Sequence, residues 1–129
     1  MSEIALTLSL LPQTYAVCRL GSEARVPRWA TSGRFFSVTR TADELSVVCE
    51  ERVIPGEVTR EGGWRCLKVL GPLDFGLTGI LASLTTPLAE ASISIFAIST
   101  YETDYIMVKA VDLERAVAAL SMSGHQISQ

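Results

Sequence analysis

The sequence predicts an α+β fold of two tandem βαββαβ repeats, each an antiparallel sheet with helices on one face, the first repeat shortened. The second half of the chain reads strand, helix, strand, strand, helix, strand in its apolar and turn-forming residues. The first half aligns with it at a constant offset of 60 residues, which pairs Pro27 with Pro87 and Phe36 with Phe96. The 129 residues are 48% hydrophobic, so the chain can bury a core without a disulfide or a metal.

The strand and helix that open the second half have clear signals. Residues 64–70 form an apolar strand that leads into a loop of glycine and proline at 71–76. Apolar residues at helical spacing follow over 77–91 and predict an amphipathic helix. Pro87 lies inside this helix and removes one backbone hydrogen bond. We therefore expect a kink near 83–86 or a division into two short helices.

The remaining elements complete the pattern. Residues 92–100 and 104–109 are rich in β-formers and flank a short polar turn, which predicts a hairpin. Asp112 can cap a second helix over 113–121, and 126–128 can add a last strand. This order is the ferredoxin-like plan.

The first half predicts strands and little helix. Around 27–30 there is room for only a short helical turn. The turn-rich segment 53–63 is the natural boundary between the repeats, which gives domains 1–62 and 63–129. Glu44, Glu50 and Glu51 are read as a solvated edge. The predicted strands are 4–10, 15–20, 35–40 and 45–50.

Composition excludes several partners and compartments. The formal net charge of -3 leaves no basic footprint for nucleic acid. No apolar run approaches the ~18 residues of a membrane span. The amino terminus carries an acid where a secretory signal would carry a base, so it reads as a first strand. Cys18, Cys49 and Cys66 form no CxxC pair, which favours reduced, buried thiols in the cytoplasm.

Catalytic and metal-binding patterns are lacking in the sequence. His125 is the one histidine, and it follows a helix stop near the end of the chain, where a frayed or final-strand position is expected. No paired histidine and cysteine spacing suits a metal. We therefore predict no enzyme activity, no catalytic residue, no cofactor and no metal.

The loop from Gly71 to Gly79 joins a strand to a helix but matches neither nucleotide-binding glycine motif. A glycine loop that leads into a helix presents unpaired N–H groups and the positive end of the helix dipole, which attract a carboxylate. The alternative is a tight turn in which Gly76 or Gly79 adopts an unusual backbone angle.

Complementary charge lies in the hairpin from Ser99 to Asp104. Carboxylates and hydroxyls at the end of a strand pair can accept hydrogen bonds from an ammonium or a guanidinium. If Asp104 lies close to 76–78, both ends of an amino acid are matched. The alternative is ordinary turn composition without a binding role.

The runs 71–81, 87–89 and 94–109, with 37–49 in the first half, resemble the ACT-type amino-acid-binding domains of the CASTOR-like, or ACT_7, group. This group of small bacterial proteins is related to the regulatory domains of aspartate kinases. The resemblance implies tandem ACT-like domains that bind a free amino acid and act as a sensor. Carried over by position, and with the hairpin residues above, the ligand-binding residues are Asp74, Gly76, Leu77, Thr78, Ser94, Ile95, Ser99 and Asp104.

Two functions follow as hypotheses. The first is a stand-alone cytoplasmic regulator that couples binding of an amino acid to a partner or to a homodimer interface. The second is a ligand-free structural or dimerisation module, in which exposed sheet edges join two copies.

Overall fold

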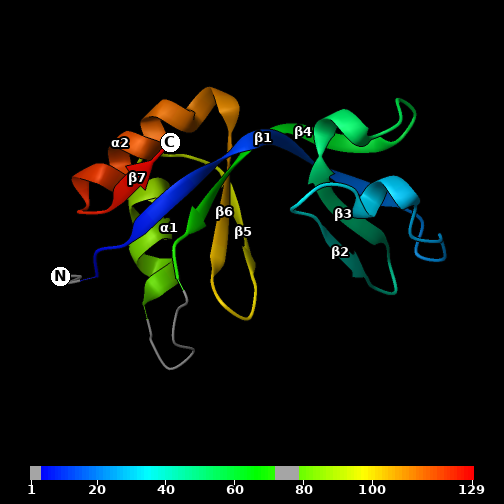
Figure 1. Ribbon diagram of the computed structural model, residues 1–129, viewed down its shortest axis with the longest axis horizontal. Helices are drawn as coiled ribbons and strands as arrows, with labels where there is room; N and C mark the ends of the chain where they lie inside the picture. Colours follow the sequence, from blue (N-terminus) through cyan, green and yellow to red (C-terminus); the bar gives the residue numbers. More distant parts are fainter. Residues whose placement is uncertain (1–3, 72–78) are drawn as a thin grey trace. The chain divides into compact units, whose positions relative to one another are not determined.

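The computed structural model of the chain describes residues 4–71 and 79–129 (Figure 1). It contains two compact units, Gln13–Trp64 and a discontinuous unit of Met1–Pro12 with Arg65–Gln129. We call them the N-unit and the C-unit. Strand β1 (Thr7–Leu20) begins in the C-unit and ends in the N-unit, and β4 (Thr59–Val69) runs from the N-unit into the C-unit. The units therefore differ from the predicted tandem 1–62 and 63–129, because the start of the chain groups with the C-unit.

The sheet of the C-unit has the strand order β7-β1-β4-β6-β5. Strands β5 (Ile95–Ser99) and β6 (Asp104–Lys109) pair antiparallel and form the predicted hairpin. Strand β7 (Gln126–Ser128) pairs parallel to β1, with Thr7 opposite Gln126. The amino-terminal segment thus adds a strand that the pattern of the second half does not contain.

Helices α1 (Ile80–Glu90) and α2 (Leu113–Met122) cover one face of the C-unit sheet (Figure 1). They share one apolar core with alternate residues of the strands, as the amphipathic spacing predicts. Of the two outcomes expected at Pro87, a kink or a division of the helix, the division is wrong, since α1 continues through the proline. The fully buried members of this core are Leu8, Leu67, Val69, Leu84, Leu88, Ile106, Val108, Ala116 and Leu120.

The N-unit has its own small core. Strand β3 (Leu45–Glu50) pairs antiparallel with both β1 and β2 (Ser37–Arg40). Two short 3₁₀ turns cover the sheet, η1 (Arg28–Thr31) at the predicted helical turn and η2 (Glu51–Val53). A third 3₁₀ turn, η3 (Ala110–Asp112), precedes α2 in the C-unit. The core of the N-unit comprises Ala16, Cys18, Ala30, Val47, Cys49 and Ile54.

Two expectations for the N-unit need correction. The strands predicted at 4–10 and 15–20 are one continuous strand, β1. Glu50 does not belong to a solvated edge, because it is 4% exposed and its Oε1 accepts a hydrogen bond from Arg52 Nε at 2.9 Å. Glu51 also has a structural role, since its Oε1 accepts the N–H of Gly63 at 3.0 Å.

The three cysteines are free and buried, as predicted. Burial raises the pKa of the Cys66 thiol to about 12. Burial is also the main cause that raises the pKa of Cys49 to about 12. These thiols pack as small apolar groups. None of the helices in 4–71 and 79–129 has the length and apolar character needed to cross a membrane.

Candidate functional site

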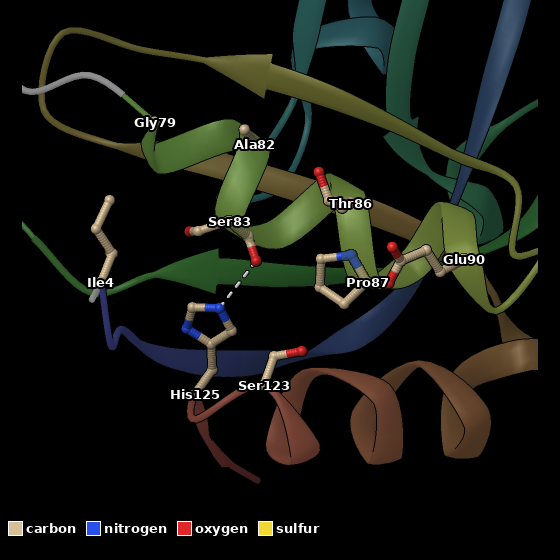
Figure 2. A pocket seen from close by; sticks show the side chains of 9 residues that line it. All are labelled: Ile4, Gly79, Ala82, Ser83, Thr86, Pro87, Glu90, Ser123 and His125. Atoms are coloured by element: carbon tan, nitrogen blue, oxygen red, sulfur yellow. Dashed lines mark hydrogen bonds between the residues drawn. The ribbon is translucent and has the colours of Figure 1, made fainter. Parts of the chain in front are cut away.

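A cavity of about 450 Å³ lies beside α1 in the C-unit (Figure 2). We call it the α1 pocket. One wall is a single face of the helix, where residues recur at helical spacing. The other wall comes from the segment between α2 and β7, and Ile4 lies at one end. Its volume is within the range of small-molecule sites. The lining residues are Ile4, Gly79, Ala82, Ser83, Thr86, Pro87, Glu90, Ser123 and His125.

Pro87 leaves one backbone carbonyl of α1 free to bind the opposite wall of this pocket. Proline has no N–H, so the carbonyl of Ser83, four residues earlier, has no helical donor. His125 Nε2 lies 3.0 Å from that oxygen, the contact drawn as a dashed line in Figure 2. An N–H on Nε2 supplies the hydrogen bond that the proline removes. This contact explains how α1 continues through a proline.

The other nitrogen of the same ring binds the backbone just before β1. The backbone N–H of Leu6 donates to His125 Nδ1 at 3.1 Å. Because Nδ1 accepts this bond, the ring is the neutral tautomer with its proton on Nε2. His125 is 4% exposed and directly precedes β7, so of the two expected positions the frayed one is wrong and the one near the final strand is close to what is found. The imidazole links α1, β1 and the segment between α2 and β7. One signal in the sequence could have indicated this role of His125: Pro87 leaves the Ser83 carbonyl of α1 without a helical donor.

The polar groups of the α1 pocket suit a ligand with charge at both ends. Gly79 is the N-cap of α1 with φ of 81°, a conformation that favours glycine, and it follows the predicted carboxylate loop. At the opposite end, Glu90 lies one turn after Thr86, and Ser123 also lines the pocket. Among the described residues, the Glu90 carboxylate has no hydrogen-bond or ion-pair partner. This end can therefore accept an ammonium or guanidinium.

The β5–β6 hairpin holds two of the predicted site residues together. Ser99 is opposite Asp104 in the register, and its hydroxyl donates to Asp104 Oδ1 at 2.6 Å. The Thr103 hydroxyl donates to the Val69 carbonyl at 2.6 Å, which anchors the turn to β4. A second cavity of about 140 Å³ adjoins this turn. It is lined by Lys68, Gly71, Thr100, Glu102, Thr103 and Tyr105, so neither Ser99 nor Asp104 faces it.

The other predicted residues do not gather at the hairpin. Ser94 is exposed just before β5, and Ile95 packs against the core of the C-unit. Five residue steps along a strand separate Ser94 from Ser99, about 16 Å. One small amino acid cannot reach both. The α1 pocket is lined by none of the four predicted residues that the structure describes, Ser94, Ile95, Ser99 and Asp104. Asp74, Gly76, Leu77 and Thr78 lie outside the described residues.

The site has the features of a binding site. No group of three or more histidine, cysteine or acidic residues able to hold a metal occurs in the part of the chain that the structure describes. The one histidine uses both ring nitrogens in structural hydrogen bonds. What the α1 pocket offers is shape, hydrogen-bond acceptors and one carboxylate.

Comparison with known proteins agrees with this fold. A family model described as an ACT domain matches residues 59–122, and a model of an N-terminal domain matches 13–57. A crystal structure of a protein from Agrobacterium tumefaciens is 39% identical, covers 97% of this chain and 93% of its own, and superposes with a TM-score of 0.92. Aspartate kinase from Synechocystis is 20% identical, covers 99% of this chain and 29% of its own, and shares the fold with a TM-score of 0.66.

Curated relatives include the protein named cytosolic arginine sensor for mTORC1 subunit 1 from Bos taurus. It is 32% identical over 99 residues, which are 68% of this chain and 30% of the relative. The chain thus spans about a third of the length of this relative. The human protein named CASTOR3P is 31% identical over 70% of this chain and 64% of its own length. The chain belongs to the ACT-domain family, in its CASTOR-like group.

Proposed function

We propose that the protein is a regulatory protein without catalytic activity that binds a free amino acid and couples its occupancy to a partner or to a second copy of the chain. The observation that carries the proposal is the ACT-domain match over residues 59–122, which includes all of α1 and therefore one wall of the α1 pocket. Relatives named as arginine sensors support an amino acid as the ligand class.

The α1 pocket supports a basic amino acid in one orientation. The N-terminal end of α1 at Gly79 favours the ligand carboxylate, because the first N–H groups of a helix and its dipole attract an anion. Glu90, with Thr86 and Ser123 nearby, favours a cationic side chain. An 11-residue helix is about 16 Å long, so the pocket can hold an extended ligand. The resemblance assigns Asp74, Gly76, Leu77 and Thr78 to the ligand as well, and in this proposal they remain candidate contacts outside the described residues.

The predicted residues of β5 and β6 offer a competing position. Asp104, with Ser99, presents a carboxylate at the hairpin, and Ser94 with Ile95 lies at the other end of β5. If the ligand cation binds Asp104, the Ser99 hydroxyl already shares that carboxylate. Glu90 has no such competitor among the described residues. We therefore assign the cation to Glu90 first and to Asp104 second.

Binding regulates only if it favours one arrangement of the protein over another. His125 supplies a route for this, because its ring ties α1 to β1 and to the segment before β7. A ligand that moves α1 changes the geometry of both hydrogen bonds. The expected coupling is about 1–3 kcal/mol, the usual range between linked sites.

The first experiment is a thermal-shift screen of the folded protein against the twenty amino acids. A ligand at 100 times its Kd adds about 2.7 kcal/mol of stability, so a selective response is measurable. Glu90→Gln should abolish a response to arginine or lysine, and Asp104→Asn should leave most of it. Glu114→Gln is the matched control, since Glu114 is exposed on α2. No response to any amino acid would contradict the proposal.

A ligand-free dimerisation module is the second candidate function. Strand β5 is the last in the sheet order and contains no charged residue. Uncharged edge strands tend to pair with another chain. A homodimer by light scattering that dissociates in Ala97→Lys, together with no response in the amino-acid screen, would favour this candidate. Ala97 is exposed near the middle of β5, so the substitution disturbs no core contact.

A further inference from the structure

A cavity of about 350 Å³ lies within the N-unit, distant in sequence from every residue assigned above. We call it the N-unit pocket. Its size is within the range of small-molecule sites. The lining comes from β1, from the start of β3 and from β4. The residues are Val17, Cys18, Arg19, Glu44, Ser46, Thr59, Arg60, Glu61 and Trp64.

The floor of the N-unit pocket is apolar. Trp64 is 8% exposed, and Val17 and Cys18 lie on the adjoining strand β1. An indole beside a valine presents a surface that suits an aliphatic or aromatic side chain. The polar groups are therefore confined to the remaining walls of the pocket.

Two opposite charges line the pocket without pairing with each other. Arg19 is directly opposite Ser46 in the β1–β3 register, and Glu44 lies two residues before Ser46. Among the residues that the structure describes, the Arg19 guanidinium makes one hydrogen bond, from NH2 to the Asp43 carbonyl at 3.2 Å. Within 4–71 and 79–129, the Glu44 carboxylate has no hydrogen-bond or ion-pair partner. Each group keeps most of its binding capacity.

The second arginine of the pocket is different. Arg60 directs its guanidinium to the backbone carbonyls of Val58, Ile54 and Pro55. Its donors hold the segment before β4 in place, so Arg60 forms a wall. Arg19 is the cation available to a ligand, and Glu44 is the matching anion.

We propose that the N-unit pocket binds a small zwitterion, a free α-amino acid with an apolar side chain. Its carboxylate binds the Arg19 guanidinium, which suits a planar anion with parallel N–H donors. Its ammonium binds Glu44, with the Ser46 hydroxyl beside it. Its side chain lies on Trp64 and Val17. This site is independent of the α1 pocket, which lies in the other unit and offers an anion without a matching side-chain cation.

Tryptophan fluorescence tests the proposal directly. The chain has two tryptophans, and Trp29 packs against the core of the N-unit. In Trp29→Phe the emission comes from Trp64 alone. The probes are the twenty amino acids, with tyrosine and tryptophan measured by calorimetry. We expect a saturable change with leucine or another apolar member. Two analogues, 3-methylbutylamine and 4-methylpentanoate, each lack one charge of leucine and should bind about tenfold more weakly or worse.

Variants assign the charges. Arg19→Gln and Glu44→Gln should each weaken binding of the apolar amino acid about tenfold or more, and Arg19→Lys should recover part of the loss. Arg25→Gln and Glu57→Gln are matched controls, because both residues are exposed and neither lines the pocket. Circular dichroism checks that each variant is folded.

Four outcomes decide the result. No saturable change with any amino acid in folded protein overturns the proposal, as does binding that Arg19→Gln and Glu44→Gln leave unchanged. Binding of either analogue as tightly as leucine also overturns it. Glu90→Gln separates the sites: it should abolish the response of the α1 pocket and leave the Trp64 signal intact. If Glu90→Gln removes the Trp64 signal as well, both responses come from the α1 pocket and the N-unit pocket is not a site.

Discussion

The predicted internal repeat pairs Pro27 with Pro87, and the two prolines lie in different local structures. Pro87 lies inside an 11-residue α-helix, whereas Pro27 precedes a 3₁₀ turn of four residues. In the C-unit, His125 donates to the carbonyl that Pro87 leaves unpaired. That histidine lies just after helix α2. The N-unit has no helix in this place, because its turn η2 is followed directly by strand β4. A helix that contains a proline therefore persists here where another element supplies the missing donor.

The largest expected effect comes from removing that donor. His125→Ala leaves the Leu6 N–H and the Ser83 carbonyl without their partner and opens a void. Each unpaired group costs about 1–3 kcal/mol, so the free energy of unfolding should fall by about 2–6 kcal/mol. Urea denaturation measures it, with exposed Gln126→Ala as the control. A loss below about 0.5 kcal/mol would show that the ring is not needed by α1.

A double-mutant cycle sharpens the comparison. Pro87→Ala restores a helical N–H for the Ser83 carbonyl, so His125→Ala should cost less in this background than in the natural chain. The expected coupling free energy is about 1–2 kcal/mol, within the range for groups that share a partner. Additive effects of the two substitutions would mean that histidine and proline act independently.

A smaller effect is expected at the start of α1. Gly79 has φ of 81°, and a Cβ there would meet only Ile4 Cδ1 at 3.6 Å, so the cost of Gly79→Ala is conformational, about 1 kcal/mol. Gly33→Ala in the N-unit should cost more. Its φ is 90°, and the new Cβ would lie 2.5 Å from Glu50 Oε2. Thermal unfolding of both variants shows which one loses more stability. A larger loss of stability for Gly79→Ala than for Gly33→Ala would contradict this reasoning.

The smallest effect is a pH dependence from the buried thiols. Burial raises the pKa of Cys66 from 9.0 to about 12, so the unfolded chain loses its proton first as the pH rises. The unfolded state is then favoured, and the stability contributed by the thiol declines above about pH 9. Between pH 9 and pH 10 the loss should be about 1 kcal/mol. Cys66→Ala should reduce the loss of stability between pH 9 and pH 10 by about this amount and leave the contribution of Cys49, whose pKa burial also raises to about 12. An unchanged slope would exclude the Cys66 thiol as a source.

Local pattern predicted the hairpin, both helices and the last strand, because each rests on spacing or turn residues within about ten positions. It did not predict that β1 is continuous and belongs to both units, since strand pairing depends on residues far apart in the chain. His125 was missed for the same reason, because its partners at positions 6 and 83 are distant in sequence. Glu44 was read as a solvated acid, and only the register places it with Arg19 beside a cavity.

The pairing of the first strand with the last has a consequence for biosynthesis. Thr7 is synthesised well before Gln126, which lies opposite it in the β1–β7 register. The N-unit is one continuous segment that can gather its contacts during synthesis, whereas the C-unit is completed only after β7 has been made. Until then residues 7–9 of β1 lack one of their neighbouring strands, so we expect the C-unit to be completed later than the N-unit.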